Sequence, residues 1–160
     1  MVEGNLLEEP VDAIVNAANG NLAHAGGVAG LISRAAGAEP QQQSDALVRK
    51  HGPYPTGSAV ATTAGRLPFK AVIHVVGPRY GEGDEKRKLF RALANAFALA
   101  SERGWQSVAF PAVSSGIFAV PLDICARAYL ESARSAPLRQ VRLCLRDRPV
   151  IDAVLRELEP

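Results

Sequence analysis

Residues 11–30 read VDAIVNAANGNLAHAGGVAG, and this stretch decides the fold class. Its first part, residues 11–17, is an apolar run with the length of a buried strand. Residues 26–36 have the composition of a helix and are opened by a glycine pair. A buried strand that leads within a few residues into a helix, with Asn16 and Asn19 at the strand's end, is typical of a parallel sheet whose strands alternate with helices.

The rest of the chain continues this alternation. Further strands are predicted at residues 57–64, 71–76, 107–112 and 140–145, and further helices at residues 40–50, 84–103, 122–134 and 150–158. Strands that alternate with helices predict an α/β fold, with a mostly parallel sheet between two helical layers. No internal repeat, low-complexity tract or linker interrupts the pattern, so residues 1–160 are expected to form a single domain.

Composition excludes several classes of protein. The formal net charge is +2, from 18 basic and 16 acidic residues, which is too even to favour a polyanion such as nucleic acid as the main partner. Cys125 and Cys144 are expected to be reduced core residues, as in a cytoplasmic protein. No apolar run reaches about 18 residues, so no membrane partner is expected. No metal-ligand spacing is present.

Ligands of parallel sheets bind beyond the carboxyl ends of the strands, where we expect residues 16–28, 114–120 and 146–149. Asn19-Gly20 is typical of a hairpin turn, but a helix rather than a partner strand follows it. A glycine pair at the start of a helix exposes backbone amides that suit a phosphate. Both interpretations of the first segment stay open.

The second segment, residues 111–118, reads PAVSSGIF and joins a strand to a helix. Successive amides in such a turn can form an anion-binding nest, and the hydroxyls of Ser114 and Ser115 can add donors. Two loops of this kind on one edge suit a diphosphate better than a single phosphate. The alternative is an ordinary tight turn.

Rival motifs fit less well. Residues 112–116 approximate a nucleophile elbow around Ser114, but all three histidines precede that serine, whereas the hydrolase fold needs one after it. Neither a dinucleotide fingerprint nor a Walker A motif occurs. His74, inside a predicted strand, is interpreted as a core residue. His24 lies in the first site segment, where it is either a site residue or a solvated loop residue.

Five segments in order resemble the macro domain family, whose members bind ADP-ribose. They are Gly4-Asn5-Leu6, VDAIVNAAN, LAHAGGVAGLISRAAG, VIHVVGP and FPAVSSGIFAVP. The resemblance covers nearly the whole chain and implies a three-layer α/β/α sandwich around a mixed, mostly parallel sheet. It also implies that the two amides face a ribose while the glycines receive phosphate.

The resemblance implies roles for individual residues. Asn19 would hydrogen-bond the distal ribose, Asn16 would bind the ligand or brace the loop, and Phe118 would cover the distal ribose. The residues expected to bind ligand are Asn5, Leu6, Asn16, Ala18, Asn19, Gly26, Gly27, Val28, Ser114, Ser115, Gly116, Ile117, Phe118 and Arg146. Those expected to serve catalysis are Asn19, His24, Gly27 and Phe118.

The adenine end departs from the family pattern. Asn5 stands where many members have an aspartate that accepts from the adenine amino group. Arg146 stands where an aromatic residue often stacks on the base, and a guanidinium can stack on a purine in the same way.

Other departures concern catalysis. Ala29 and Ser33 replace an aspartate and a histidine of one hydrolase branch, and Ala25 and Ala119 replace common glycines. However, the pattern L-x-H-x-G-G-V-A-G, residues 22–30, matches another branch that removes ADP-ribose from acidic side chains.

The resemblance therefore implies a hydrolase that releases mono-ADP-ribose from acidic side chains, or cleaves related distal-ribose derivatives, with a positioned water and without metal or cofactor. The alternative is a non-catalytic reader of ADP-ribose. The expected partner is ADP-ribose or a mono-ADP-ribosylated protein, bound by a monomer. Arg146 and Arg148 at the ligand edge raise nucleic-acid binding as a third hypothesis, which the charge balance disfavours.

Overall fold

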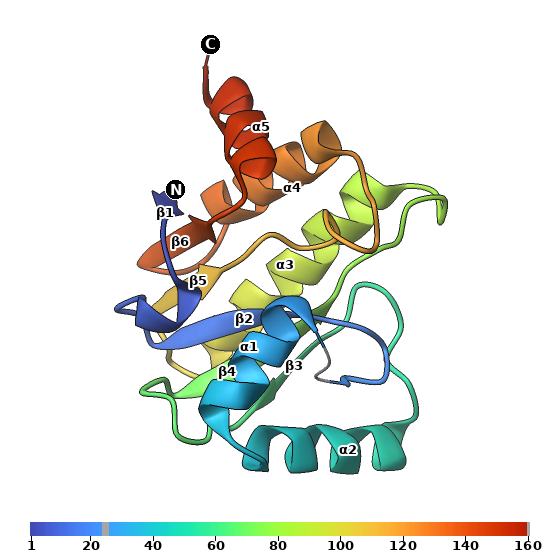
Figure 1. The fold of residues 1–160 in the computed structure, drawn as a ribbon, viewed down its shortest axis with the longest axis vertical. Helices are drawn as coiled ribbons and strands as arrows, with labels where there is room; N and C mark the ends of the chain where they lie inside the picture. Colours follow the sequence, from blue (N-terminus) through green and yellow to red (C-terminus); the bar gives the residue numbers. More distant parts are fainter. Residues whose placement is uncertain (24–25, 160) are drawn as a thin grey trace.

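The computed structural model describes residues 1–23 and 26–159 and shows one sheet between two helical layers (Figure 1). Within these described residues the sheet has six strands, in the order β1-β6-β5-β2-β4-β3. These are β1 (Val2–Glu3), β2 (Ala13–Ala18), β3 (Ala59–Thr62), β4 (Ala71–Val76), β5 (Ser107–Phe110) and β6 (Gln140–Leu145). All neighbours are parallel except β3 and β4, so the sheet is mixed and mostly parallel, as predicted.

In the part of the chain that the structure describes, five α-helices cover the sheet. They are α1 (Gly27–Ala36), α2 (Glu39–His51), α3 (Glu85–Glu102), α4 (Leu122–Arg134) and α5 (Arg148–Leu158), with a short 3-10 helix η1 at Leu6–Glu8. The cores on the two faces of the sheet show the layers. One face packs β2 and β4 against α3, α4 and α5, and the other packs them against α1 and α2. The predicted α/β/α sandwich is confirmed.

Successive side chains of β2 lie alternately on the two faces of the sheet. Ala13 and Val15 lie in the core beneath α3 and α4, whereas Ile14 lies in the core on the α1 face. All six residues of β4, which lies beside β2 in the sheet, are buried. The strands are apolar on both sides because helices cover both faces.

The boundaries predicted from sequence hold best where apolar runs are bounded by turn residues. Strands 71–76 and 140–145 and helix 122–134 have the predicted limits. The strand predicted at 107–112 ends at Phe110, because the chain turns into the second site segment there. The strand predicted at 57–64 is also shorter. The predictions did not include β1 and η1, which are too short to show periodicity.

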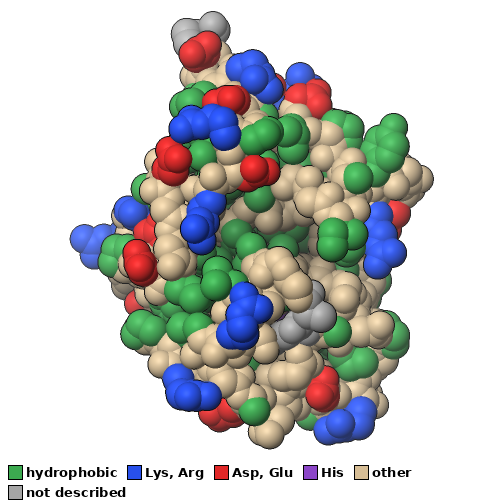
Figure 2. Space-filling model, in the orientation of Figure 1, with side chains coloured by type: hydrophobic (Ala, Val, Ile, Leu, Met, Phe, Trp, Pro, Cys, Tyr) green, Lys and Arg blue, Asp and Glu red, His purple; other side chains and the backbone are tan. Residues whose placement is uncertain are grey.

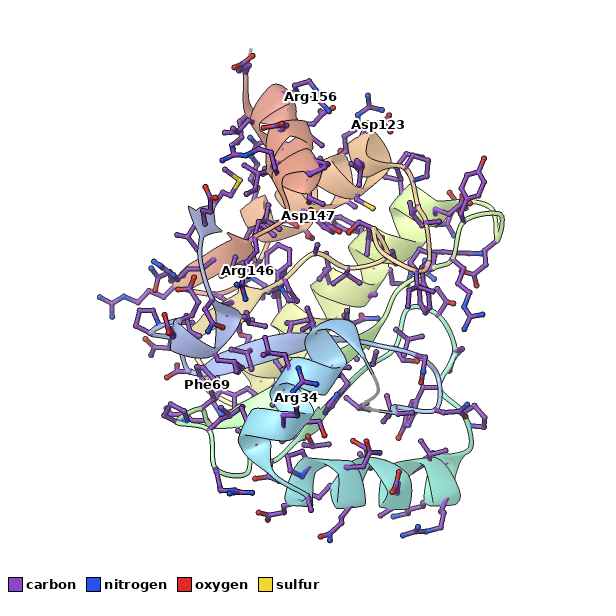
Figure 3. The ribbon with its side chains drawn as sticks, viewed as in Figure 1. Arg34, Phe69, Asp123, Arg146, Asp147 and Arg156 are labelled. Carbon is purple, nitrogen blue, oxygen red and sulfur yellow. The ribbon has the colours of Figure 1, made fainter. Side chains whose placement is uncertain are left out.

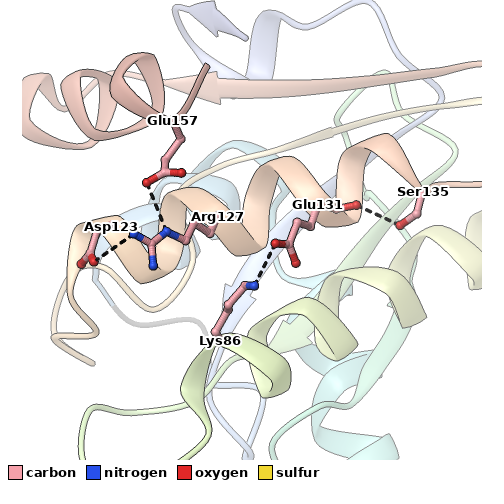
Figure 4. Close-up of polar contacts among 6 residues, drawn as sticks. All are labelled: Lys86, Asp123, Arg127, Glu131, Ser135 and Glu157. Atoms are coloured by element: carbon pink, nitrogen blue, oxygen red, sulfur yellow. Dashed lines mark hydrogen bonds and ion pairs between the residues drawn. The ribbon is translucent and has the colours of Figure 1, made fainter. Parts of the chain in front are cut away.

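Ion pairs join the three helices of one layer (Figure 4). Arg127 of α4 lies 3.2 Å from Glu157 of α5 and 4.0 Å from Asp123, and Lys86 of α3 lies 2.8 Å from Glu131. These side chains are partly exposed, so each pair stabilises the fold by about 1 kcal/mol or less. No helix in the described ranges is long and apolar enough to cross a membrane.

Asp12 links the amino ends of three strands. Its Oδ2 accepts from the Gln106 backbone N–H at 2.8 Å, its Oδ1 lies 3.5 Å from Lys70 Nζ, and its own N–H donates to Ser107 Oγ. The Gln106 N–H holds the pKa of Asp12 below its ordinary value, with a smaller contribution from Lys70.

We predict that Asp12→Ala lowers the free energy of unfolding at pH 6 by about 1–2 kcal/mol, because the Gln106 N–H loses a charged acceptor. Since the folded pKa is depressed, this stabilisation is present above about pH 4 and is lost as the pH falls below it. Urea unfolding of both proteins between pH 3 and 6 measures the difference. Asp152→Ala, on the exposed face of α5, is the control, and an equal effect there would contradict the assignment.

Candidate functional site

The parallel pairing brings the predicted site segments to one edge of the sheet. Because β1, β6, β5, β2 and β4 all run in the same direction, the residues that follow them emerge together. Asn5 and Leu6 follow β1, Arg146 follows β6, Ser114 to Phe118 follow β5, and Asn19 follows β2. Figure 2 shows the face of the molecule viewed in Figure 1, which is hollowed near its centre.

The side chain of Asn19 stabilises the turn that follows β2. Asn19 Oδ1 accepts from the N–H groups of Asn21 at 3.1 Å and Ala23 at 3.3 Å, which leaves its Nδ2 group to donate elsewhere. Gly20 is needed because a Cβ there would lie 2.6 Å from the carbonyl oxygen of Tyr54. β2 pairs only with parallel strands in the described sheet, so the hairpin interpretation of Asn19-Gly20 is wrong.

Gly26 and Gly27 open α1 with backbone angles that favour glycine. Their φ values are 72° and 52°, both residues are exposed, and nothing lies within 4 Å of a Cβ built on either. The N-cap residue is Gly26, which has no side chain to cap the helix start. Its first amides have no partner inside the helix and carry the positive end of the helix dipole, so they can bind an anion. Val28 is half-buried against the core, and His24 lies outside the described residues.

The turn after β5 is strained and closed on itself. Ser114 and Ala119 have φ values of 67° and 58°, which cost non-glycine residues about 1–2 kcal/mol each. The Val120 N–H donates to the Ser114 carbonyl at 2.9 Å, and the Ala119 N–H donates to the Gly116 carbonyl at 2.9 Å. Ser115 is half-buried and Gly116 exposed, so the backbone of the turn is open to a ligand.

Among the residues that the structure describes, Ser114 Oγ is a buried hydroxyl without a hydrogen-bond partner. It lies against Gly77 at the end of β4, where it leaves no room for a Cβ. An unpaired buried hydroxyl is costly, and a ligand oxygen that reached it would remove that cost.

Two side chains of α4 hold this turn from beneath. The fully buried Tyr129 hydroxyl accepts from the Val113 N–H at 2.7 Å and donates to the Val113 carbonyl. Cys125 Sγ donates to the Val120 carbonyl at 3.6 Å. Burial raises the pKa of Cys125 to about 11 and that of Tyr129 well above its ordinary value, so both groups stay protonated donors. Apart from the apolar face of the predicted helix, the sequence contains no signal for these two contacts.

The other end of the edge carries Asn5 and Arg146. Asn5 Oδ1 caps η1 by accepting from the Leu7 N–H at 3.0 Å, so its Nδ2 group is the one left to meet a ligand. Arg146 is exposed after β6 (Figure 3). The Leu6 side chain is 5% exposed and packs in the core with Ile14, so any contact it makes with a ligand is through its backbone.

Asn16 lies inside the sheet rather than at its edge. It is fully buried, and its Nδ2 lies 3.1 Å from His74 Nδ1, while His74 Nε2 lies 2.8 Å from Thr62 Oγ1. The amide donates to Nδ1, which assigns the imidazole proton to Nε2. His74 is therefore the core residue predicted. Asn16 therefore fits the bracing alternative better than direct ligand contact. Ala18, which was expected to bind ligand, is also buried in the core.

The site thus offers backbone amides from two neighbouring strands and side-chain amides at both ends. In the described ranges, no group of three or more His, Cys, Asp or Glu side chains could hold a metal ion.

Comparisons with known proteins agree on one family. A family model described as macro domain matches residues 15–129. The chain is 44% identical over 156 residues to an uncharacterized protein of Saccharolobus solfataricus, covering 95% of this chain and 87% of that protein. It is 49% identical over 123 residues to an O-acetyl-ADP-ribose deacetylase of Citrobacter rodentium, covering 76% and 70%. A mutant of the Oceanobacillus iheyensis macrodomain, solved with ADPR, superposes with a TM-score of 0.91 at 27% identity, covering 98% and 89%.

We predict that Tyr129→Phe lowers the free energy of unfolding by about 2 kcal/mol, because it leaves the N–H and carbonyl of Val113 buried without this partner. The ring would keep its packing against Phe110. Urea unfolding measures the loss, and hydrogen exchange should show faster exchange of the Val113 amide.

Tyr80→Phe is the control, since the Tyr80 side chain is 66% exposed. If both variants unfold at the same urea concentration as the wild type, Tyr129 does not hold the turn.

Proposed function

The chain belongs to the macro domain family, and from this premise we propose that it binds ADP-ribose and hydrolyses mono-ADP-ribose esters of acidic side chains or related distal-ribose esters. The observation that carries the proposal is the pair of open backbone turns on β2 and β5, neighbouring parallel strands. The relative named O-acetyl-ADP-ribose deacetylase supports ester hydrolysis.

The diphosphate would bind between the two turns. Gly26 and Gly27 would donate from the start of α1, and residues 114–118 from the other side, so that main-chain N–H groups neutralise the charge. The distal ribose would then lie near Asn19. Since the carbonyl oxygen of Asn19 is engaged by its own turn, its Nδ2 group would donate to a ribose hydroxyl.

Hydrolysis would depend on a positioned water. Held between a substrate phosphate oxygen and the Gly27 backbone, the water attacks the anomeric carbon of the distal ribose. The carbon–oxygen bond to the side-chain carboxylate breaks, the carboxylate leaves, and the phosphate oxygen takes the proton of the water. Phe118 would hold the ribose in the reactive orientation. Positioning and electrostatics would supply the rate, because no side-chain base is assigned. His24, whose position is not described, would tune the ribose contact.

A reader that binds ADP-ribose without cleaving it is the second candidate. Ala29 favours it, because one hydrolase branch has an aspartate at this position. Ala29 is 7% exposed, so its side chain is buried at the start of α1.

The decisive experiment incubates a mono-ADP-ribosylated acidic peptide with wild type and with Asn19→Ala. We expect the wild type to release ADP-ribose and the variant to do so with kcat lowered about 100-fold, because the ribose loses its orienting donor. Quantifying released ADP-ribose measures both rates. Asn21→Ala removes an exposed amide from the same turn and is the matched control.

Tight binding with retained label would establish the reader instead. Calorimetric titration of ADP-ribose beside AMP tests the ribose assignment separately. Equal affinities for the two ligands would mean that Asn19 does not bind the distal ribose.

We further predict that Asn5→Asp increases the preference for ADP-ribose over its hypoxanthine analogue by about five- to tenfold, worth about 1 kcal/mol. One oxygen of the new carboxylate would keep the Leu7 cap. The other would accept from the adenine amino group, whereas the Nδ2 group of Asn5 can only donate. Titration of both nucleotides gives the ratio. Asn21→Asp controls for the added charge, and an unchanged ratio in Asn5→Asp would place adenine elsewhere.

A further inference from the structure

A pocket of about 350 Å³ lies between the turn after β5 and the segment after β4. It is lined by Arg79, Tyr80, Ile117, Phe118 and Ala119. The Tyr80 N–H donates to the Phe118 carbonyl at 2.7 Å and so joins the segment after β4 to the turn after β5. Since both strands end at the ligand edge, the pocket adjoins the place proposed for the distal ribose.

Two large side chains of this pocket are open to solvent. Ile117 is 100% exposed and Tyr80 is 66% exposed. Ile117 precedes Phe118 in a turn whose other residues, Ser114, Ser115, Gly116 and Ala119, are small. Exposed apolar side chains that lie together around one pocket are typical of an interaction surface.

Arg79 adds a charge to this surface. Its guanidinium lies 4.7 Å from the centroid of the Phe118 ring, and it forms no ion pair within residues 1–23 and 26–159. Glu82 accepts from the backbone N–H of Arg79, not from its guanidinium, and also accepts from Thr56. A guanidinium stacked on an aromatic face keeps its edge donors free for a carboxylate.

We propose that Arg79, Tyr80 and Ile117 bind the polypeptide that carries the ADP-ribose, and that they select an acidic segment in which a second carboxylate lies near the modified one. The proposal rests on the proposed function, because the polypeptide leaves the distal ribose where Phe118 covers it. Arg79 pairs with the second carboxylate, while Tyr80 and Ile117 contact neighbouring apolar side chains of the segment.

The local charges favour a polypeptide over a nucleic-acid strand. Glu82 and Glu85 cap backbone amides of the segment that carries Arg79, so their carboxylates are fixed next to it. A nucleic-acid strand carries a phosphate at every nucleotide, and the carboxylates of Glu82 and Glu85 would repel these phosphates. A peptide with one or two carboxylates needs only the guanidinium of Arg79.

The test compares two substrates of the whole chain, a mono-ADP-ribosylated acidic peptide and O-acetyl-ADP-ribose, which has no peptide. We expect Arg79→Ala to raise KM for the peptide about tenfold while its kcat stays within twofold, and to leave both constants for the small ester unchanged. Arg79→Lys keeps the charge and should recover most of the peptide KM. Raising the salt concentration should shrink the difference between wild type and Arg79→Ala, because exposed charges are screened.

Arg103→Ala is the matched control. Its guanidinium also stacks on an aromatic ring, that of Trp105 at 5.8 Å, but it lies at the other end of α3. A helix of 18 residues is about 27 Å long, so Arg103 cannot reach the pocket.

Three results would overturn the proposal. An equal loss on both substrates would mean that Arg79 acts through the Phe118 ring. An unchanged peptide KM would remove the contact. Tighter binding of an ADP-ribosylated oligonucleotide than of the peptide would assign the surface to nucleic acid. If the wild type cleaves neither substrate, the proposed hydrolysis is wrong, but the peptide-binding surface can still be tested by the ratio of the affinities for modified peptide and free ADP-ribose. A ratio lowered about tenfold by Arg79→Ala supports the surface. An unchanged ratio overturns it.

Discussion

β2 pairs with a parallel strand on each side, and the rest of the candidate site depends on that pairing. Parallel neighbours end at the same edge, so the turns after β4, β2 and β5 lie within a few strand spacings of one another. An antiparallel partner for β2 would send one of these turns to the opposite edge. The site therefore needs no long side chain to bring its parts together, and the groups that meet there are mainly backbone amides.

Backbone amides are open to a ligand only where the chain leaves regular structure, and this geometry is costly. Glycine lowers the cost at residues 26 and 27, but Ser114 and Ala119 adopt the left-handed region with a Cβ. The second turn keeps its shape because Tyr129 and Cys125 bond both of its ends from within the core. Rigid packing in α4 thus maintains a strained, exposed turn, and the site is prepared before a ligand arrives.

The sequence predicts features that depend on neighbouring residues better than contacts between segments that are far apart in the chain. The strand at 71–76 and the helix at 122–134 were predictable because their patterns are local and bounded by turn residues. The buried role of His74 was predictable from its place in an apolar strand. Its partners Asn16 and Thr62 were not, because the register that brings three strands together is absent from any one of them. Asn5 shows the same limit. The sequence places an asparagine at this point, but whether its oxygen caps a helix depends on the turn that the chain enters.

Under the proposed function, the two kinds of surface at this edge would separate recognition into two tasks. Main-chain donors would recognise the part of the ligand that is always the same, and substitutions in the turns would disturb them through backbone geometry. The side chains of Arg79, Tyr80 and Ile117 are exposed and contribute little to the hydrophobic core. These residues can therefore differ between proteins without loss of stability of the fold. A shared grip on the nucleotide with a variable rim would let one fold distinguish what the distal ribose is attached to. The guanidinium stacked on Phe118 connects these tasks, because the ring belongs to the turn and the charge belongs to the rim.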